Sequence, residues 1–576
     1  MSAPIASQPS VAEHGPGHPR VETQALLERL LRDFIGKLPE GAGRALQDVF
    51  RSLAAQPERV AEIQTRYYGE HLELWSRLLL TDRPPAEADV NDPRFAGPAW
   101  SAHPWFDFLR RSYLINARWL TELMENAQVP EAKKRRAAFA LRQLLDALAP
   151  TNFPETNPEV IRLAAETGGT SLVDGFEHLR HDLARGRIQM SDESAFEVGR
   201  NLAITPGFVV YQNPIVQLIQ YTPQTTQVHS TPLLIVPPFI NKYYILDLQP
   251  ENSFVRYALE QGFQVFLVSW RNVPRELGQS SWEDYIRQGV YAPLEAIREI
   301  TGADQINTLG FCVGGTLLAT ALAVMPEPRQ VSSMTLLATM LDFSDVGEIG
   351  VYVDEEYVRQ CEEVYSEGGL MPGSWLASTF ASLRANELVW YFVINNYLKG
   401  KTPRAFDLLY WNSDGANVPG RLYAWYLRNA YLENNLRVPG KLQLCGQPLD
   451  FRRIDCPAFV LAARDDHIVP WRSAYVSTQL LARKIEFVLA ASGHIAGVVN
   501  PPAAKRRNHW VQDSTPVGAD DWLGLARSEP GSWWLRWSAW LGEQSGPTVP
   551  AKSAAGSARY PALERAPGSY VKERGS

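Results

Sequence analysis

The chain has 576 residues, of which 45% are hydrophobic and 11% aromatic, and its formal net charge is −7 at pH 7. This length exceeds one ordinary domain, so we expect a large core with at least one attached region. The negative charge argues against nucleic acid as the main partner, because nucleic-acid binding needs a basic face. The four cysteines form no C-x-x-C pair, which indicates neither a disulfide framework nor a metal site. The sequence contains no run of 18 or more apolar residues, so we predict no transmembrane segment.

The first third of the chain is predicted to be helical. Residues 1–20 combine Pro, Gly, Ser and His without the apolar run of a signal peptide, which predicts a disordered tail. Between residues 21 and 195, apolar side chains recur at three- and four-residue spacing, as at Leu27, Leu30 and Leu31. We therefore expect a helical N-terminal domain over 21–195.

β-rich sequence begins near residue 196 and defines the core. Apolar runs that are typical of buried parallel strands occupy residues 208–211, 216–221, 233–236 and 265–268, and further strand-like runs follow at 306–311, 334–337, 458–463 and 485–489. Turn and helix signals separate the later strands. The pattern predicts an α/β fold, with a mostly parallel sheet flanked by helices, over residues 196–341 and 439–545.

Two further segments depart from this core pattern. Residues 342–438 are rich in Trp, Tyr and Asn, and an insertion after a strand lies at the catalytic edge of such a sheet, so we predict a cap over the active site. Residues 546–576 are rich in Pro, Ala, Ser and Gly as far as Tyr560, which predicts a flexible C-terminal tail.

The candidate nucleophile is Cys312. Gly310 and Gly314 lie two positions on either side of it, between a strand-like run and an apolar helical segment. This is the G-x-nucleophile-x-G spacing of a strand-to-helix elbow, which exposes its central atom, here with sulfur in place of oxygen. The alternative is that Cys312 is a small buried hydrophobe and that the glycines only permit close packing.

An acid and a base follow the cysteine in the chain order that the α/β-hydrolase fold requires. Asp466 comes just after the strand-like run 458–463, and His494 follows the run 485–489. Each alone could be a solvated loop residue, but three residues in order, each after an apolar strand, favour a catalytic set of Cys312, Asp466 and His494. His467 neighbours Asp466, and we assign it a structural role.

The same fold predicts the donors that stabilise an oxyanion. One is the backbone N–H of Val313, directly after the nucleophile. The second comes from the loop after the strand 233–236, where Pro237 and Pro238 precede Phe239 and Ile240. Side chains do not identify a backbone donor, so Ile240 is assigned by position.

Several long motifs resemble those of one family, the polyhydroxyalkanoate synthases, and within it the class I enzymes, which work as a single type of polypeptide on short-chain substrates. The resemblance runs from about residue 196 to Lys572. Its specific stretches are residues 196–201, 236–248, 269–272, 310–316, 396–400, 465–471 and 492–497. In the family the elbow cysteine is the nucleophile, here Cys312, and Asp466 and His494 match the other two members of the triad.

The resemblance implies an acyltransferase that polymerises (R)-3-hydroxyacyl-CoA, such as 3-hydroxybutyryl-CoA, into polyester with release of coenzyme A. The substrate carries the coenzyme A, so no separate cofactor is expected. The expected partners are the growing polyester chain, the granule surface, a second copy of the chain in a homodimer, and phasin-type granule proteins. The expected location is the cytoplasm, at the surface of polyester granules.

Four further residues are candidates for substrate binding. Lys505, Arg506 and Arg507 follow the catalytic histidine and could hold the phosphates of coenzyme A, although a solvated basic cluster is the alternative. Trp411 lies in the predicted cap, where its alternative role is packing. Two other functions stay open: a thioester or dienelactone hydrolase with the same triad, and a non-catalytic granule-coat protein, which would need no triad.

Overall fold

The computed structural model describes residues 41–79 and 92–575, and these fall into two compact units. The smaller unit comprises residues 41–79 and 110–149, and the larger one comprises 92–109 and 150–575. The predicted tail 1–20 lies outside the described residues. None of the described helices is long and apolar enough to cross a membrane.

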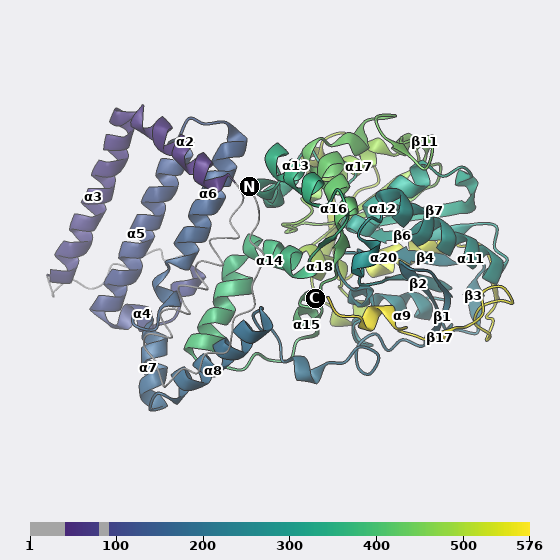
Figure 1. Ribbon diagram of the computed structural model, residues 1–576, viewed down its shortest axis with the longest axis horizontal. Coiled ribbons are helices and arrows are strands. Elements are labelled where there is room, and N and C mark those ends of the chain that lie inside the picture. The colour runs from purple at the N-terminus through teal and green to yellow at the C-terminus, as the bar shows by residue number, and fades with distance from the viewer. Residues whose placement is uncertain (1–40, 80–91, 576) are drawn as a thin grey trace. The chain divides into compact units, whose positions relative to one another are not determined.

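The smaller unit is a group of helices that lie side by side (Figure 1). Its helices are α2 (Ala42–Ala54), α3 (Pro57–Leu79), most of α5 (Pro104–Asn126) and α6 (Glu131–Ala147). Apolar side chains at helical spacing on α2, among them Ala45 and Val49, pack with Met124 of α5 and Ala137 of α6. Ion pairs such as Arg118–Glu70, at 2.7 Å, link α5 to α3 on the outside.

The larger unit is built on one sheet of eleven strands in the order β15-β14-β13-β12-β7-β6-β4-β5-β2-β1-β17. Their bounds are β1 (Gly207–Gln212), β2 (Val216–Tyr221), β4 (Leu233–Val236), β5 (Val265–Trp270), β6 (Ile306–Phe311), β7 (Val331–Leu337), β12 (Ala458–Ala463), β13 (Ile485–Ala490), β14 (Asn508–Val511), β15 (Arg527–Pro530) and β17 (Glu564–Arg565). The six strands from β13 to β5 are parallel to their neighbours, and the flanking strands are antiparallel. The predicted α/β fold with a mostly parallel sheet is therefore confirmed.

Helices cover both faces of this sheet (Figure 1). They are α9 (Phe254–Glu260), α10 (Trp282–Ile286), α11 (Ala292–Thr301), α12 (Val313–Ala323), α17 (Trp471–Leu480), α18 (His494–Val498), α19 (Ala519–Leu525) and α20 (Trp534–Glu543). The central strands are buried along their whole length, as the continuous apolar runs of the sequence predict. The carboxyl ends of parallel strands then share one edge, where loops can bring residues from distant parts of the sequence together.

The structure corrects the direction of the first two strands. We expected β1 and β2 to be parallel, but β1 pairs antiparallel with β2, and β2 pairs antiparallel with β5. Only residues 213–215 separate β1 from β2. So short a connection can join antiparallel neighbours but not parallel ones, which need a crossover of a dozen or more residues.

No strand of the main sheet lies between β7 and β12, and the chain between them contains the segment 342–438 that we predict to be a cap and call the cap below. Its helices are α13 (Glu355–Val364), α14 (Gly373–Leu383), α15 (Asp407–Asn412), α16 (Gly420–Tyr426) and the π-helices η9 (Asn386–Trp390), η10 (Val393–Leu398) and η11 (Leu427–Leu432). The short strands β8 (Leu370–Met371) and β9 (Val418–Pro419) pair with each other inside it.

The boundary of the predicted helical domain differs in the structure. Helices α4 (Ala99–Ala102), α7 (Pro158–Glu166) and α8 (Thr170–Arg185) belong to the larger unit. Gly175 of α8 lies so close to η10 that an added Cβ would stand 1.9 Å from the Tyr397 carbonyl oxygen. The Tyr397 hydroxyl also donates to Asp182, at 2.8 Å. Helical periodicity predicts a helix here, but it does not say which unit the helix packs against.

The prediction of a flexible tail over 546–576 is wrong for the residues of this segment that the structure describes. Strand β16 (Thr548–Pro550) pairs with β3 (Gln227–His229), and β17 extends the main sheet beside β1. Tyr570 and Val571 are buried. Strands of two or three residues are too short to show an alternating apolar pattern, so the composition of this segment concealed its pairing.

Candidate active site

Cys312 occupies a strained turn between a strand and a helix. Strand β6 ends one residue before it and helix α12 begins one residue after it, and its backbone angles are φ 51° and ψ −128°. A positive φ costs a non-glycine residue on the order of 1–3 kcal/mol, so the surrounding contacts must impose it. One such contact is the Cys312 N–H, which donates to the Leu337 carbonyl oxygen of β7 at 2.9 Å. The side chain is half-buried.

The glycines around Cys312 are required by close backbone contacts. A Cβ at Gly310 would stand 2.4 Å from the Cα of Gly315. A Cβ at Gly314 would stand 2.4 Å from the Pro237 carbonyl oxygen, in the loop that follows β4. Helix α12 therefore starts directly against the strand before it and the loop beside it, as an elbow requires. The same contact places the loop after β4 beside the elbow.

Asp466 and His494 lie on the loops after β12 and β13 and contact each other. The Nδ1 atom of His494 is 2.6 Å from Oδ2 of Asp466, and both side chains are buried. The other carboxylate oxygen of Asp466 accepts from the backbone N–H groups of Ile468, at 2.8 Å, and Val469, at 2.9 Å. These bonds fix the carboxylate, and the carboxylate in turn fixes the orientation of the imidazole.

His494 lies close to both Asp466 and Cys312. Its Nδ1 contacts Asp466, and the ring is near enough to Cys312 for the charge of the cysteine to influence the titration of the imidazole. Burial acts to lower the pKa of His494, but the charges of Asp466 and Cys312 and their hydrogen bonds outweigh burial and raise that pKa well above its usual range. The ring of Phe311 stacks against the imidazole at 5.5 Å between centroids. The structure thus brings Cys312, His494 and Asp466 into one chain of contacts.

Both predicted oxyanion donors belong to segments beside Cys312. Val313 opens α12, so its N–H has no partner within the helix. Ile240 lies in the loop after β4, and its carbonyl oxygen accepts from the Ala416 N–H of the cap at 3.1 Å. The cap therefore holds the loop that carries the second candidate donor. That these two N–H groups bind an oxyanion stays a prediction.

Two cap tyrosines beside Cys312 were not predicted as site residues: Tyr426 was interpreted only as part of the packing of the cap, and Tyr431 was not considered. Tyr426, at the end of α16, and Tyr431, in η11, are both close enough for the charge of Cys312 to act on their hydroxyls. Burial is the main cause that raises the pKa of each phenol, and the charge of Cys312 adds to it. Neutral phenols in this position could donate hydrogen bonds to a bound acyl group. Their spacing carries no signal, because aromatic residues occur throughout the cap.

The surroundings of the other candidate residues do not indicate a role in substrate binding or catalysis. Trp411 is buried, and its indole N–H donates to the Lys242 carbonyl oxygen at 2.7 Å, so this donor is already used within the protein. Lys505 and Arg506 are exposed, and the Arg507 guanidinium donates to the Ala496 carbonyl oxygen of α18. His467 is half-buried, and burial followed by the charge of Arg384 lowers its pKa. Their roles toward a substrate stay predictions.

The described residues contain no group of three or more His, Cys, Asp or Glu side chains that could hold a metal ion. The four cysteines, all of them described, are free thiols.

The mostly parallel sheet carries a cysteine elbow after β6, an acid after β12 and a histidine after β13. This arrangement defines a protein of the α/β-hydrolase class. Comparison with known families agrees: residues 231–501 match the family described as alpha/beta hydrolase fold. Residues 91–258 match a second family, described as the N-terminus of poly-beta-hydroxybutyrate polymerase (PhaC).

Several relatives that match most of the chain are named as poly(3-hydroxyalkanoate) polymerases or as a subunit of one. The chain is 49% identical to the poly(3-hydroxyalkanoate) polymerase subunit PhaC of Cupriavidus necator over 534 residues, which are 92% of this chain and 90% of that protein. It is 40% identical to the subunit of the same name from Rhizobium meliloti, over 92% of this chain and 88% of that protein. It is also 40% identical to the poly(3-hydroxyalkanoate) polymerase of Methylorubrum extorquens, over 92% of this chain and 89% of that protein. The chain belongs to the poly(3-hydroxyalkanoate) polymerase family.

Proposed function

We propose that the chain polymerises short-chain (R)-3-hydroxyacyl-CoA, such as 3-hydroxybutyryl-CoA, into polyester and releases coenzyme A, with Cys312 as the covalent acyl carrier. The observation that carries this proposal is the contact chain from Cys312 through His494 to Asp466, in a member of this family. A granule-coat protein would not need such a chain of contacts.

In the first step Cys312 becomes acylated. His494 takes the proton of the Cys312 thiol, and the thiolate attacks the thioester carbonyl carbon of the substrate. The N–H groups of Val313 and Ile240 stabilise the resulting oxyanion. The bond to the sulfur of coenzyme A then breaks, and His494 returns its proton to that leaving thiolate. Asp466 stabilises the imidazolium that exists between the two proton transfers.

In the second step the chain grows. The 3-hydroxyl of an incoming substrate gives its proton to His494, and its oxygen attacks the carbonyl carbon of the chain on Cys312. An ester bond forms, the thioester to Cys312 breaks, and His494 gives its proton to the leaving Cys312 sulfur, so the lengthened chain is carried by the incoming coenzyme A. Cys312 takes it back by a further thioester exchange, which releases coenzyme A. A thioester on sulfur matches the energy of the incoming thioester, so this exchange is nearly reversible, whereas a serine ester would be a poorer acyl donor.

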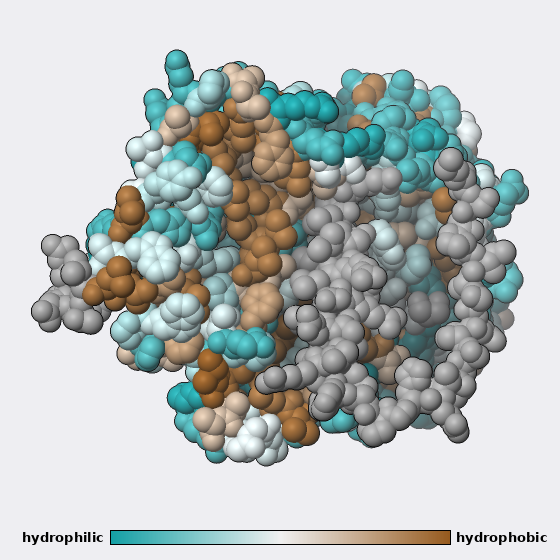
Figure 2. Space-filling model, turned by 60° about the vertical axis from the view of Figure 1, so that its left-hand side comes forward, coloured by the Kyte–Doolittle hydropathy of each residue, from teal (hydrophilic) through white to brown (hydrophobic). Residues whose placement is uncertain are grey.

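The proposal extends to partners and location. Coenzyme A arrives with the substrate, so no resident cofactor is needed. The chain acts as a homodimer in the cytoplasm, at the surface of the polyester granules, where phasin-type proteins are its neighbours. Support for the granule surface comes from helix α3, which exposes four large apolar or aromatic side chains: Tyr68, Leu72, Trp75 and Leu79. Figure 2 shows brown, hydrophobic side chains gathered on the face that is turned toward the viewer.

One assay separates the polymerase from its closest alternative. Purified protein is incubated with 3-hydroxybutyryl-CoA, and the released coenzyme A, free 3-hydroxybutyrate and insoluble polyester are measured together. The polymerase yields coenzyme A and polyester. Free hydroxyacid in equal amount to the coenzyme A, with no polyester, would identify a thioester hydrolase instead.

A further inference from the structure

The segment Tyr570–Gly575, here named the clasp, lies beside the candidate oxyanion loop and connects it to neighbouring elements. The backbone carbonyl oxygen of Glu573 accepts a hydrogen bond from the Lys242 ammonium. The Glu573 carboxylate pairs with Nε of Arg271, one residue beyond β5, at 3.1 Å. Lys242 is buried, and a buried ammonium needs such partners to offset its lost hydration. Through Lys242, the clasp touches the loop that carries Ile240.

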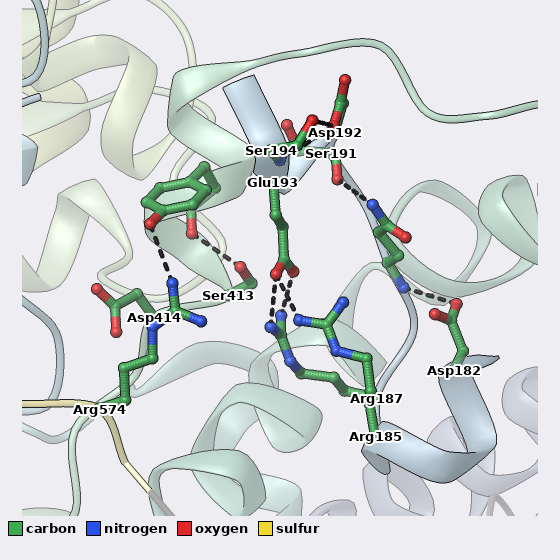
Figure 3. Close-up of polar contacts among 12 residues, drawn as sticks. Asp182, Arg185, Arg187, Ser191, Asp192, Glu193, Ser194, Ser413, Asp414 and Arg574 are labelled. Atoms are coloured by element: carbon green, nitrogen blue, oxygen red, sulfur yellow. Dashed lines mark hydrogen bonds and ion pairs between the residues drawn. The ribbon is translucent and has the colours of Figure 1, made fainter. Parts of the chain in front are cut away.

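The next residue of the clasp reaches the base of the cap. The Arg574 guanidinium donates to the Tyr410 hydroxyl at 3.3 Å. The backbone carbonyl oxygen of Arg574 accepts from the Asn272 side chain at 2.7 Å. The oxygen of the same Asn272 side chain accepts from the Asn417 backbone N–H at 2.9 Å. Figure 3 shows Arg574 beside Asp414, and their charges act on each other. Arg574 is thus held by cap residues between 410 and 417.

A third segment meets the clasp at the same place. Glu193 forms ion pairs with Arg185 and Arg187, both at 2.6 Å, and Figure 3 shows its carboxylate pointing toward these two guanidinium groups. The charge of Glu193 also acts on Arg574. The polar environment of Arg574 is therefore built by three stretches that are far apart in the sequence.

The same stretch of the cap holds the oxyanion loop directly. The Ala416 N–H donates to the Ile240 carbonyl oxygen at 3.1 Å, and Asn241 bridges to Gly415. The Tyr244 hydroxyl donates to Asp414 at 2.9 Å. The loop after β4 therefore lies between α12 on one side and residues 414–416 on the other. The clasp binds both the loop, through Lys242, and the cap stretch, through Arg574.

We propose that Glu573 and Arg574 are positioning residues for acyl transfer: they set the position of the Ile240 N–H relative to Cys312 by joining the oxyanion loop to the base of the cap. The inference rests on the proposed function, because it concerns the oxyanion of that reaction. A donor must stand about 2.7–3.1 Å from the developing oxyanion, and a misplacement of about 1 Å can lower a rate about 10²-fold. Neither residue touches the substrate.

The test is the double variant Glu573→Gln/Arg574→Met, which removes the ion pair with Arg271 and the contacts to Tyr410 and Asp414 while preserving side-chain length. We expect kcat for coenzyme A release to fall about 10- to 100-fold with an unchanged KM for 3-hydroxybutyryl-CoA. Alkylation of Cys312 by iodoacetamide should stay within about twofold of wild type, because it needs the thiolate but no oxyanion donor. The single variant Arg574→Lys should keep a kcat closer to wild type than the double variant does, since it keeps a cation beside Asp414.

Arg559→Gln is the matched control, because Arg559 lies in the same stretch 546–575 but pairs with Glu295 and Glu299 of α11. It should keep wild-type kcat. A double variant with wild-type kcat would overturn the inference. So would equal losses of kcat and of Cys312 alkylation, which would indicate general unfolding of the site. If the double variant does not fold, Glu573→Gln alone is measured by the same criteria. Failure of the proposed function would be seen separately, as coenzyme A release by Cys312→Ala.

Discussion

At the scale of single residues, Cys312 combines a strained backbone conformation with the position of a nucleophile. A positive φ at a cysteine is tolerated only because β7, the oxyanion loop and the neighbouring glycines enforce it. We predict that Cys312→Ala abolishes both coenzyme A release and polymer formation while the Tm changes little, since the substitution removes only one sulfur atom from a half-buried site. Coenzyme A release by the folded variant would contradict the assignment. Cys312→Ser should also be nearly inactive.

The pKa of His494 leads to a second residue-scale prediction. Burial lowers this pKa and the charge of Asp466 raises it, so Asp466→Asn should lower the pKa of His494, as measured by NMR titration of the ring. Acyl transfer should fall about 10²- to 10⁴-fold. His467→Gln, the neighbouring control, should leave the pKa of His494 raised. An unchanged pKa of His494 in Asp466→Asn would contradict this account of the site.

The same pKa shift has a consequence for stability. The pKa of His494 is raised in the folded state, so the protonated ring stabilises the fold fully below its unfolded pKa of about 6.5, and this contribution is lost as pH rises through the folded pKa. We expect the stability difference between wild type and Asp466→Asn to be larger at pH 6 than at pH 10. Urea unfolding at both pH values measures it. An equal difference at both would exclude a shifted imidazole as its source.

The sequence was sufficient to single out Cys312, Asp466 and His494 as a candidate catalytic set, because each follows an apolar run and the chain order of the three is restricted by the fold. Their catalytic roles stay predictions. It was not sufficient to predict the surroundings of Trp411, whose indole N–H bonds to a backbone carbonyl 169 positions away. Nor could it predict the two phenols beside Cys312. Contacts between side chains and distant backbone leave no periodic pattern in the sequence. Sequence patterns can therefore identify candidate reacting groups, but they do not identify the residues that surround them.

At the scale of elements, Arg428 connects two helices of the cap. Its guanidinium pairs with Glu355 and Glu362 of α13, at 2.8 and 2.7 Å, and with Glu433 at 3.1 Å. Arg428 belongs to η11, the helix that carries Tyr431 toward Cys312. The three pairs are partly solvated, so each contributes little, but together they hold η11 against α13.

We therefore predict that Arg428→Gln accelerates hydrogen exchange across η11 and lowers kcat several-fold, while the exchange of the central strands stays unchanged. Arg359→Gln is the matched control, because Arg359 forms a single ion pair with Glu363 within α13. It should change neither quantity. Unchanged exchange in η11 after loss of Arg428 would mean that aromatic packing alone holds this helix in place.

At the scale of the whole molecule, the exposed apolar side chains of the smaller unit bear on what the protein contacts. Helix α3 of the smaller unit buries Ile63 and Leu74 and exposes Leu72, Trp75 and Leu79 by 70%, 49% and 74%. Exposed apolar side chains gathered on one helix indicate a surface that meets another apolar phase or partner. Under the proposed function, the product is an insoluble polyester, and we propose the granule surface as the apolar phase that this helix meets.

The last prediction follows from this exposure. The triple variant Leu72→Ser, Trp75→Ser and Leu79→Ser should shift the protein from sedimented granules to the supernatant, because it removes apolar contact area worth roughly 25 cal/mol per Å². Initial coenzyme A release in the absence of granules should stay at the wild-type rate. The matched control replaces three exposed apolar residues of the larger unit, Val517, Leu525 and Leu535, by serine. Equal release of the two variants from granules would show that α3 has no special part in this contact, and a loss of granule-free activity in the α3 variant would place its role in catalysis.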